Sequence, residues 1–136
     1  EIGTPTEEAT AELGLAAVDQ STGHHTHAAD HARQGLALAA HRGLRVLAGQ
    51  AHTALADALL ALGRHDQALD HAQQAMDLYR ETGHRLGYAR AVRLIGSTLR
   101  DTGDLAKAVH CWQEALELFT DIGSPEAQET RKLLDG

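Results

Sequence analysis

Four histidines lie close together near the start of the chain: His24, His25, His27 and His31. Three of them, His24, His27 and His31, have the i, i+3, i+7 spacing that places side chains on one face of a helix. Neutral imidazoles on a shared face can bind Zn²⁺ or Ni²⁺. The first hypothesis is therefore a metal site with His24, His27 and His31 as candidate ligands.

Glycines divide the chain at regular intervals, because seven of the thirteen follow one another at a spacing of twenty residues. Each interval leaves about 16 helical residues, or roughly 24 Å of helix at 1.5 Å per residue. Glycine also suits the left-handed turn that ends a helix. We therefore predict one helix for each interval. The glycines are Gly3, Gly23, Gly43, Gly63, Gly83, Gly103 and Gly123, and the predicted helices span 4–22, 24–42, 44–62, 64–82, 84–102, 104–122 and 124–134.

Alternate intervals resemble each other more than neighbours do, as residues 63–83 and 103–123 show, so the full repeat is forty residues long. Both prolines follow this period: Thr4-Pro5 and Ser124-Pro125 each predict a helix N-cap followed by proline at the first helical position. Short connections make neighbouring helices antiparallel. We predict a single domain, residues 1–136, with units 4–42, 44–82 and 84–122 and an extra helix at 124–134.

The composition favours an all-α fold. Hydrophobic residues make up 43% of the chain but aromatic residues only 3%, so alanine and leucine dominate the apolar class and helices can pack closely. A net charge of -7 argues against general binding to nucleic acid or anionic membranes. No apolar run approaches the ~20 residues of a membrane span. The single cysteine, Cys111, cannot form an internal disulfide and fits a cytoplasmic location.

The residue pattern within the repeats resembles the tetratricopeptide repeat (TPR), whose pattern is W-x2-L-G-x2-Y…A-x3-F. The last full unit reads Val92-x2-Ile95-Gly96-x2-Leu99, then Gly103, then Ala108-x3-Trp112-x2-Ala115. The middle unit matches more loosely, and the first unit departs from the pattern at Asp19. The forty-residue period exceeds the usual one and is typical of long-helix variants. The resemblance implies an α-α superhelix, a solenoid of seven antiparallel helices.

The stretch from Gly87 to Leu134 also resembles the C-terminal TPR region of actinobacterial transcriptional activators of the SARP-like and NB-ARC-containing types. In that family the DNA-binding and nucleotide-binding parts lie upstream, and none of their motifs occurs in this sequence. The chain starts at Glu1 rather than methionine, which fits a piece of a longer protein. The resemblance implies the regulatory or interaction part of a larger bacterial regulator, with no direct nucleic-acid binding of its own.

The repeat register offers a different interpretation of the histidines. His31 occupies the same repeat position as His71 and Cys111, on the polar flank of the second helix of each unit. No further cluster supplies a fourth ligand with recognisable spacing, and structural zinc sites have strict geometry. The register therefore favours a solvated flank, with no metal and no cofactor. A ligand- or metal-responsive sensor on the same scaffold is the alternative.

Three arginines form a basic stripe in this acidic chain. Arg90, Arg93 and Arg100 project within an arc of about 80° on one helix, and guanidinium groups bind carboxylates through paired hydrogen bonds. The TPR resemblance implies that the first helix of each unit lines a concave, peptide-binding face. The predicted binding residues are Gln50, Thr53, Asp57, Leu60, Arg90, Arg93, Ser97 and Arg100.

The predicted partner is a protein or peptide with an acidic segment or a C-terminal carboxylate. In the alternative interpretation, the arginines pair with acids on adjacent helices, such as Glu114 or Glu117. Leu133 and Leu134 end a helix that lacks its partner, so a homodimer through the terminal repeats is a further expectation. The sequence contains no P-loop, G-x-S-x-G or H-E-x-x-H motif. We therefore predict a non-enzymatic interaction module.

Overall fold

A computed structural model describes residues 3–136, and this part of the chain is built from helices without any strand. The helices are α1 (Pro5–Ser21), α2 (His25–His41), α3 (Arg45–Ala61), α4 (His65–Thr82), α5 (Arg85–Asp101), α6 (Leu105–Ile122) and α7 (Glu126–Asp135). The predicted all-α class is confirmed, and each helix lies within or close to the interval expected for it.

The same turn joins every pair of successive helices. Between α1 and α2, the His24 N–H donates to the Asp19 carbonyl at 2.7 Å and the Gly23 N–H to the Gln20 carbonyl at 3.3 Å. This pair of bonds satisfies carbonyl groups at the helix end and requires a left-handed residue after the last turn. The seven periodic glycines all have positive φ, between 67° and 95°. The role predicted for them is confirmed.

The two proline-containing helix starts differ slightly. Thr4 caps α1 as predicted, because its side chain accepts from the Glu7 N–H at 3.1 Å while the Glu7 carboxylate accepts from the Thr4 N–H at 3.2 Å. At the other end, α7 begins at Glu126, one residue later than Ser124-Pro125 predicts. The Ser124 hydroxyl still accepts from the Glu126 N–H at 3.2 Å, so serine caps the helix from one residue further away.

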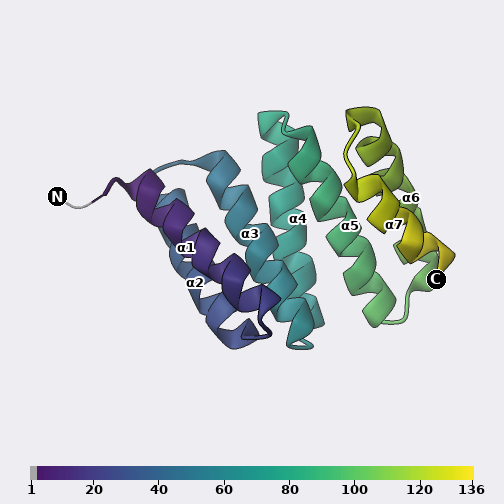
Figure 1. Ribbon diagram of the computed structural model, residues 1–136, viewed down its shortest axis with the longest axis horizontal. Helices are drawn as coiled ribbons and strands as arrows, with labels where there is room; N and C mark the ends of the chain where they lie inside the picture. The colour runs from purple at the N-terminus through teal and green to yellow at the C-terminus, as the bar shows by residue number, and fades with distance from the viewer. Residues whose placement is uncertain (1–2) are drawn as a thin grey trace.

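The helices form a ribbon of antiparallel hairpins in two layers (Figure 1). Each helix packs against the next one, and α3 also contacts α1 and α5, so the odd-numbered helices form one layer and the even-numbered helices the other. Alanines fill much of the space between the layers, with Leu55, Leu59 and Phe119 as large, fully buried side chains. This arrangement confirms the predicted α-α superhelix. None of the helices in residues 3–136 is both long and apolar enough to cross a bilayer.

Glycines inside helices make room for the few aromatic rings. The Tyr79 ring, 4% exposed, extends from α4 between α3 and α5. A Cβ atom on Gly49 would lie 2.9 Å from its Cζ, and one on Gly87 would lie still closer to its Cε1. Gly96 similarly faces Trp112, because a Cβ atom there would lie 2.8 Å from the indole Cδ1. The rings thus replace missing side chains on the facing helices, and the contact of Tyr79 with Gly87 joins two successive units.

Candidate functional site

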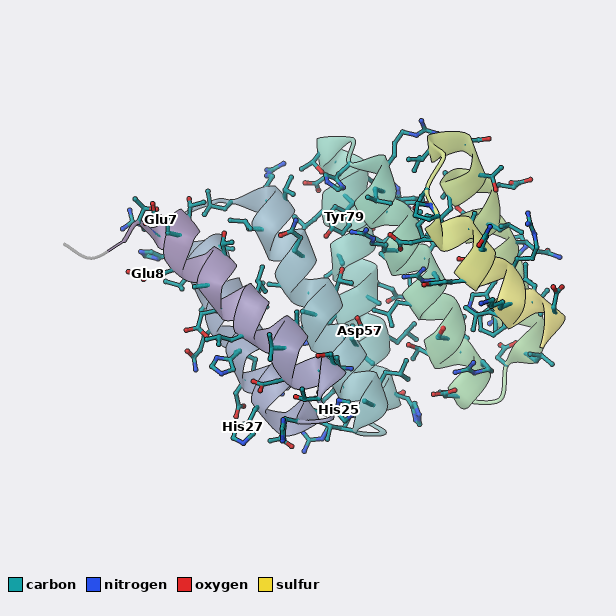
Figure 2. The ribbon with its side chains drawn as sticks, viewed as in Figure 1. Glu7, Glu8, His25, His27, Asp57 and Tyr79 are labelled. Carbon is teal, nitrogen blue, oxygen red and sulfur yellow. The ribbon has the colours of Figure 1, made fainter. Side chains whose placement is uncertain are left out.

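A hollow of about 320 Å³ lies between α3 and α5 on the layer of odd-numbered helices. It is lined by Thr53, Asp57 and Leu60 from α3 and by Arg90, Arg93, Leu94, Ser97 and Arg100 from α5. The spacings of three and four residues keep each set on one face of its helix. Figure 2 labels Asp57 on α3 within this part of the molecule.

The hollow brings together all but one of the predicted binding residues. Gln50 is exposed one turn before Thr53 on α3 and does not line it. Leu94 lines it without having been predicted; the side chain is 7% exposed and supplies an apolar floor. Its position was available from the sequence, since Leu94 lies four residues after Arg90 and three before Ser97 on the same face of the helix.

A carboxylate of the chain itself binds two of the stripe arginines. Glu126, at the start of α7, accepts from Arg90 Nε at 2.9 Å through Oε1 and at 3.1 Å through Oε2. Arg93 Nη1 lies 3.2 Å from Glu126 Oε2. Burial raises the pKa of Glu126, but hydrogen bonds and charge from Arg90 and then Arg93 outweigh burial and hold it below its usual range. The alternative interpretation was right that an acid pairs with the stripe but wrong in naming Glu114 or Glu117.

Aromatic rings from α6 support the other sides of the guanidinium groups. The Arg93 guanidinium carbon lies 5.1 Å from the centroid of the Phe119 ring, and that of Arg100 lies 5.6 Å from the Trp112 ring. Arg100 Nε also donates to Asp101 at 3.0 Å. Arg93 Nη1 is buried and lacks an aligned hydrogen bond, so its contact with Glu126 is one of charge. The rings hold the guanidinium groups in place without using their N–H donors for hydrogen bonds.

Asp57 is an acidic group facing this basic stripe. Its side chain is exposed, yet it lies in the hollow with protein on several sides. This crowding raises the pKa of its carboxyl to about 6, and the charge of Arg93 opposes the shift only in part. Asp57 forms no ion pair with any other residue in 3–136. The hollow therefore combines donors from α5 with one weakly acidic carboxyl from α3.

Comparison with known proteins agrees with the repeat pattern. A sequence model described as tetratricopeptide repeat matches residues 47–134. The chain belongs to the tetratricopeptide repeat family. No curated protein sequence matches it.

Solved structures share the fold of this TPR chain at low sequence identity. A Rap protein complexed with Competence and Sporulation Factor matches with a TM-score of 0.93 and 20% identity, over 98% of this chain and 38% of that one. Aspartyl phosphate phosphatase F from Bacillus subtilis gives 0.89 and 18%, over 98% and 35%. The N-terminal domain of stress-induced protein-1 from C. elegans gives 0.70 and 19%, over 98% and 99%. The TPR chain thus spans little more than a third of the length of the Rap protein and of the phosphatase.

The histidine cluster divides between solvent and a helix contact. His24 and His27 are exposed, and their ring centroids lie 6.3 Å apart. His31 instead binds α1, with Nδ1 2.7 Å from Glu12 Oε2 and Nε2 3.6 Å from Asp19 Oδ2. The solvated-flank interpretation is therefore wrong for His31, because the flank faces the partner helix. In residues 3–136 no group of three His, Cys, Asp or Glu side chains could hold a metal ion.

The same contact recurs in the second hairpin with different chemistry. His71, one repeat after His31, has its Nδ1 2.9 Å from Nδ1 of His52 on α3. Burial lowers the pKa of His52 to about 4, helped by the nearby charge of His71, and burial also lowers the pKa of His71. Sequence reasoning missed these pairs. The sequence signal that could have found them is the constant separation of 19 residues between the two members of each pair.

Proposed function

We propose that this TPR chain is a non-enzymatic interaction module whose α3–α5 hollow binds an acidic segment or a C-terminal carboxylate of a partner protein. The observation that supports this most directly is the contact of Glu126 with Arg90 and Arg93. In this contact a carboxylate accepts hydrogen bonds from Arg90 and lies against the charge of Arg93, which is the ligand chemistry that we propose for the partner.

Room for a further carboxylate remains at the other end of the stripe. Arg90 and Arg93 share one acid, and Arg100 is paired only with the adjacent Asp101. Leu60 and Leu94 provide apolar contact between the two ends. A peptide laid along the hollow would place its acidic group against Arg100 and Arg93 and its apolar side chain against these leucines.

The fold comparison supports a protein or peptide as the partner. One structure with the same fold is a Rap protein in complex with Competence and Sporulation Factor. For this chain, a peptide partner, a role within a larger bacterial transcriptional regulator, a cytoplasmic location and a homodimer through the terminal repeats are parts of the proposal. The regulator context rests on the resemblance of residues 87–134 to the activator family.

A charge-reversal experiment tests the proposal. The probe is a fluorescein-labelled glutamate-rich octapeptide with a free C-terminal carboxylate, and fluorescence anisotropy measures its affinity at several salt concentrations. We expect Arg93→Glu plus Arg100→Glu to weaken binding at least about tenfold, since close charge contacts contribute 1.4 kcal/mol or more. Arg42→Glu plus Arg64→Glu, an equal charge change at two exposed positions outside the hollow, is the matched control. Unchanged affinity and salt dependence in the double variant would exclude the hollow as the site.

A further inference from the structure

A second hollow, of about 370 Å³, lies between α2, α3 and α4 and shares no residue with the α3–α5 hollow. Its walls are mainly apolar and include Leu36, Ala39, Ala48 and Leu78. Five polar or charged side chains also line it: His52 and Gln74, together with Asp77 and the Arg45–Glu81 ion pair. We call this space the α2–α4 pocket. An apolar space with a few polar groups is typical of a site that receives one side chain of a partner.

The repeat itself indicates which side chain fits. Forty residues after Ala48 and Gln74, the next unit has Tyr88 and Glu114. The Tyr88 hydroxyl donates to Glu114 Oε2 at 3.4 Å, so the phenol bridges α5 and α6. The hollow at the matching place in that unit is smaller, about 300 Å³, and Glu114 does not line it. The chain thus narrows this position with a tyrosine in one unit and leaves it wider, beside an alanine, in the unit before.

His52 provides the second observation. The residue is 8% exposed and lines the α2–α4 pocket. Its Nδ1 is directed to Nδ1 of His71, and no other residue in 3–136 hydrogen-bonds to its ring, so Nε2 is the nitrogen left for a ligand. A neutral imidazole nitrogen either donates or accepts one hydrogen bond, according to the tautomer. A hydroxyl group can take either role, which suits a phenol better than a purely apolar ring.

We propose that the α2–α4 pocket receives a tyrosine side chain from a partner protein, with its ring beside Ala48 and Leu78 and its hydroxyl at His52 and Gln74. Tyrosine combines a large apolar ring with one polar tip and is enriched where interfaces bury single anchoring residues. A second copy of the described chain cannot supply it. Its aromatic residues are all at least half-buried within their own fold: Tyr79, Tyr88, Trp112 and Phe119.

Small probes test the chemistry of the pocket. Amide chemical shifts of the ¹⁵N-labelled chain are followed by NMR during titration with N-acetyl-tyrosinamide, N-acetyl-phenylalaninamide and N-acetyl-leucinamide. We expect the tyrosine probe to shift residues of α2, α3 and α4 and to bind about three- to tenfold more tightly than the phenylalanine probe, which lacks the hydroxyl. Equal binding of all three probes would overturn the proposal, because the surface would then be a general apolar groove.

Variants show whether the probe sits where we propose. Ala48→Tyr copies the next unit and should fill the pocket and abolish the shifts. If that variant fails to fold, His52→Val, which copies Val92 of the next unit, should remove the preference for tyrosine over phenylalanine. Arg93→Glu plus Arg100→Glu should leave the titration unchanged, which separates this proposal from the one for the α3–α5 hollow. Shifts that persist in the folded Ala48→Tyr variant would contradict the assignment.

A tripeptide distinguishes a protein segment from a free small molecule. N-acetyl-Gly-Tyr-Gly-amide has backbone on both sides of the ring, as a partner protein would. We expect it to bind at least as tightly as N-acetyl-tyrosinamide. If the tripeptide is excluded while the single amino acid still binds, the pocket takes a small aromatic molecule and the partner proposed here is wrong.

Discussion

The first two hairpins place different chemical groups at the same pair of positions. In the first, Glu12 Oε2 lies 2.7 Å from His31 Nδ1, so a carboxylate meets an imidazole. In the second, His52 faces His71 at 2.9 Å, so only one of two adjoining rings can carry the bridging proton, and a positive charge on either is opposed. The backbone geometry is shared, but the first contact joins an acid to a base and the second joins two bases.

The third hairpin shows a neutral version of the contact. At the two positions that His52 and His71 occupy in the second hairpin, the third has Val92 and Cys111, which belong to one apolar cluster. Burial raises the pKa of the Cys111 thiol, so the group is held as a neutral thiol rather than activated as a nucleophile. Helix register thus sets which positions meet, while the residues placed there decide what the contact does.

The largest expected effect concerns acid. The folded-state pKa of His52, about 4, lies below the ordinary 6.5, so the unfolded chain takes up the proton first as the pH falls. Stability from this group is complete above pH 6.5 and is lost towards pH 4, by up to about 3 kcal/mol. Chemical denaturation at pH 7 and pH 4 measures it. The double variant His52→Val plus His71→Cys copies the third hairpin and should lose this part of the acid sensitivity.

His52→Glu tests the same pair of positions in another way, because it recreates the glutamate–histidine contact of the first hairpin. A carboxylate beside His71 favours the protonated ring, so the contact should now stabilise the fold at mildly acidic pH and weaken as the pH rises. If His52→Glu keeps the acid sensitivity of the natural chain, the histidine pair is not its source.

The next effect concerns the contact between units. Tyr79 lies against Gly87, whereas the counterparts one unit earlier are Ala39 and Leu47. Gly87→Ala places a methyl group against the packed ring and should cost about 2 kcal/mol, more than the gain in helix propensity. Thermal denaturation measures the loss. When Tyr79→Ala is also present, Gly87→Ala should hardly change the free energy of unfolding. A loss of stability that persists in this background would contradict the steric explanation.

A smaller effect is expected at Glu126. Its counterpart one unit earlier is Leu86, and that of Arg90 is Gln50, so only the last pair of odd-numbered helices carries this ion pair. Glu126→Gln should destabilise the fold by about 1 kcal/mol and strengthen binding of the acidic octapeptide by freeing two arginines. Glu129→Gln, on the exposed part of α7, is the control. Weaker binding in Glu126→Gln would mean that Glu126 helps to form the site instead of competing for it.

The smallest effect is the pH dependence of binding at Asp57, whose counterpart one unit later is Ser97. The raised pKa, about 6, means that Asp57 becomes neutral as the pH falls from 7 to 5.5. Repulsion of an acidic peptide then decreases, so affinity in anisotropy titrations should rise by a few-fold over this range. Asp57→Ser should bind with the higher affinity throughout, and Asp66→Asn should behave as the natural chain does. If the affinity of Asp57→Ser still depends on pH in this way, a group other than Asp57 is responsible.

Residues whose roles depend on helix register were predictable from the sequence. The glycine period fixed where helices end, and the repeat pattern placed Thr53, Asp57 and Leu60 opposite Arg90 and Arg93. The contact of Glu126 with the stripe was not predictable, because it depends on how α7 is inclined over α5 and on which rotamers the long side chains adopt. The pairing of His31 was missed for a related reason: periodicity gives the face of a helix but not the side chain that it meets.

The identical turn between successive helices has a consequence for how the repeat array can be lengthened by duplication. Each junction offers the same glycine and the same two backbone bonds, so a copied segment of forty residues, such as 64–103, would begin and end in a joint that already exists. The reach of the ribbon can therefore change in whole modules without a new connection, and a longer descendant would acquire extra binding surface along with its extra length.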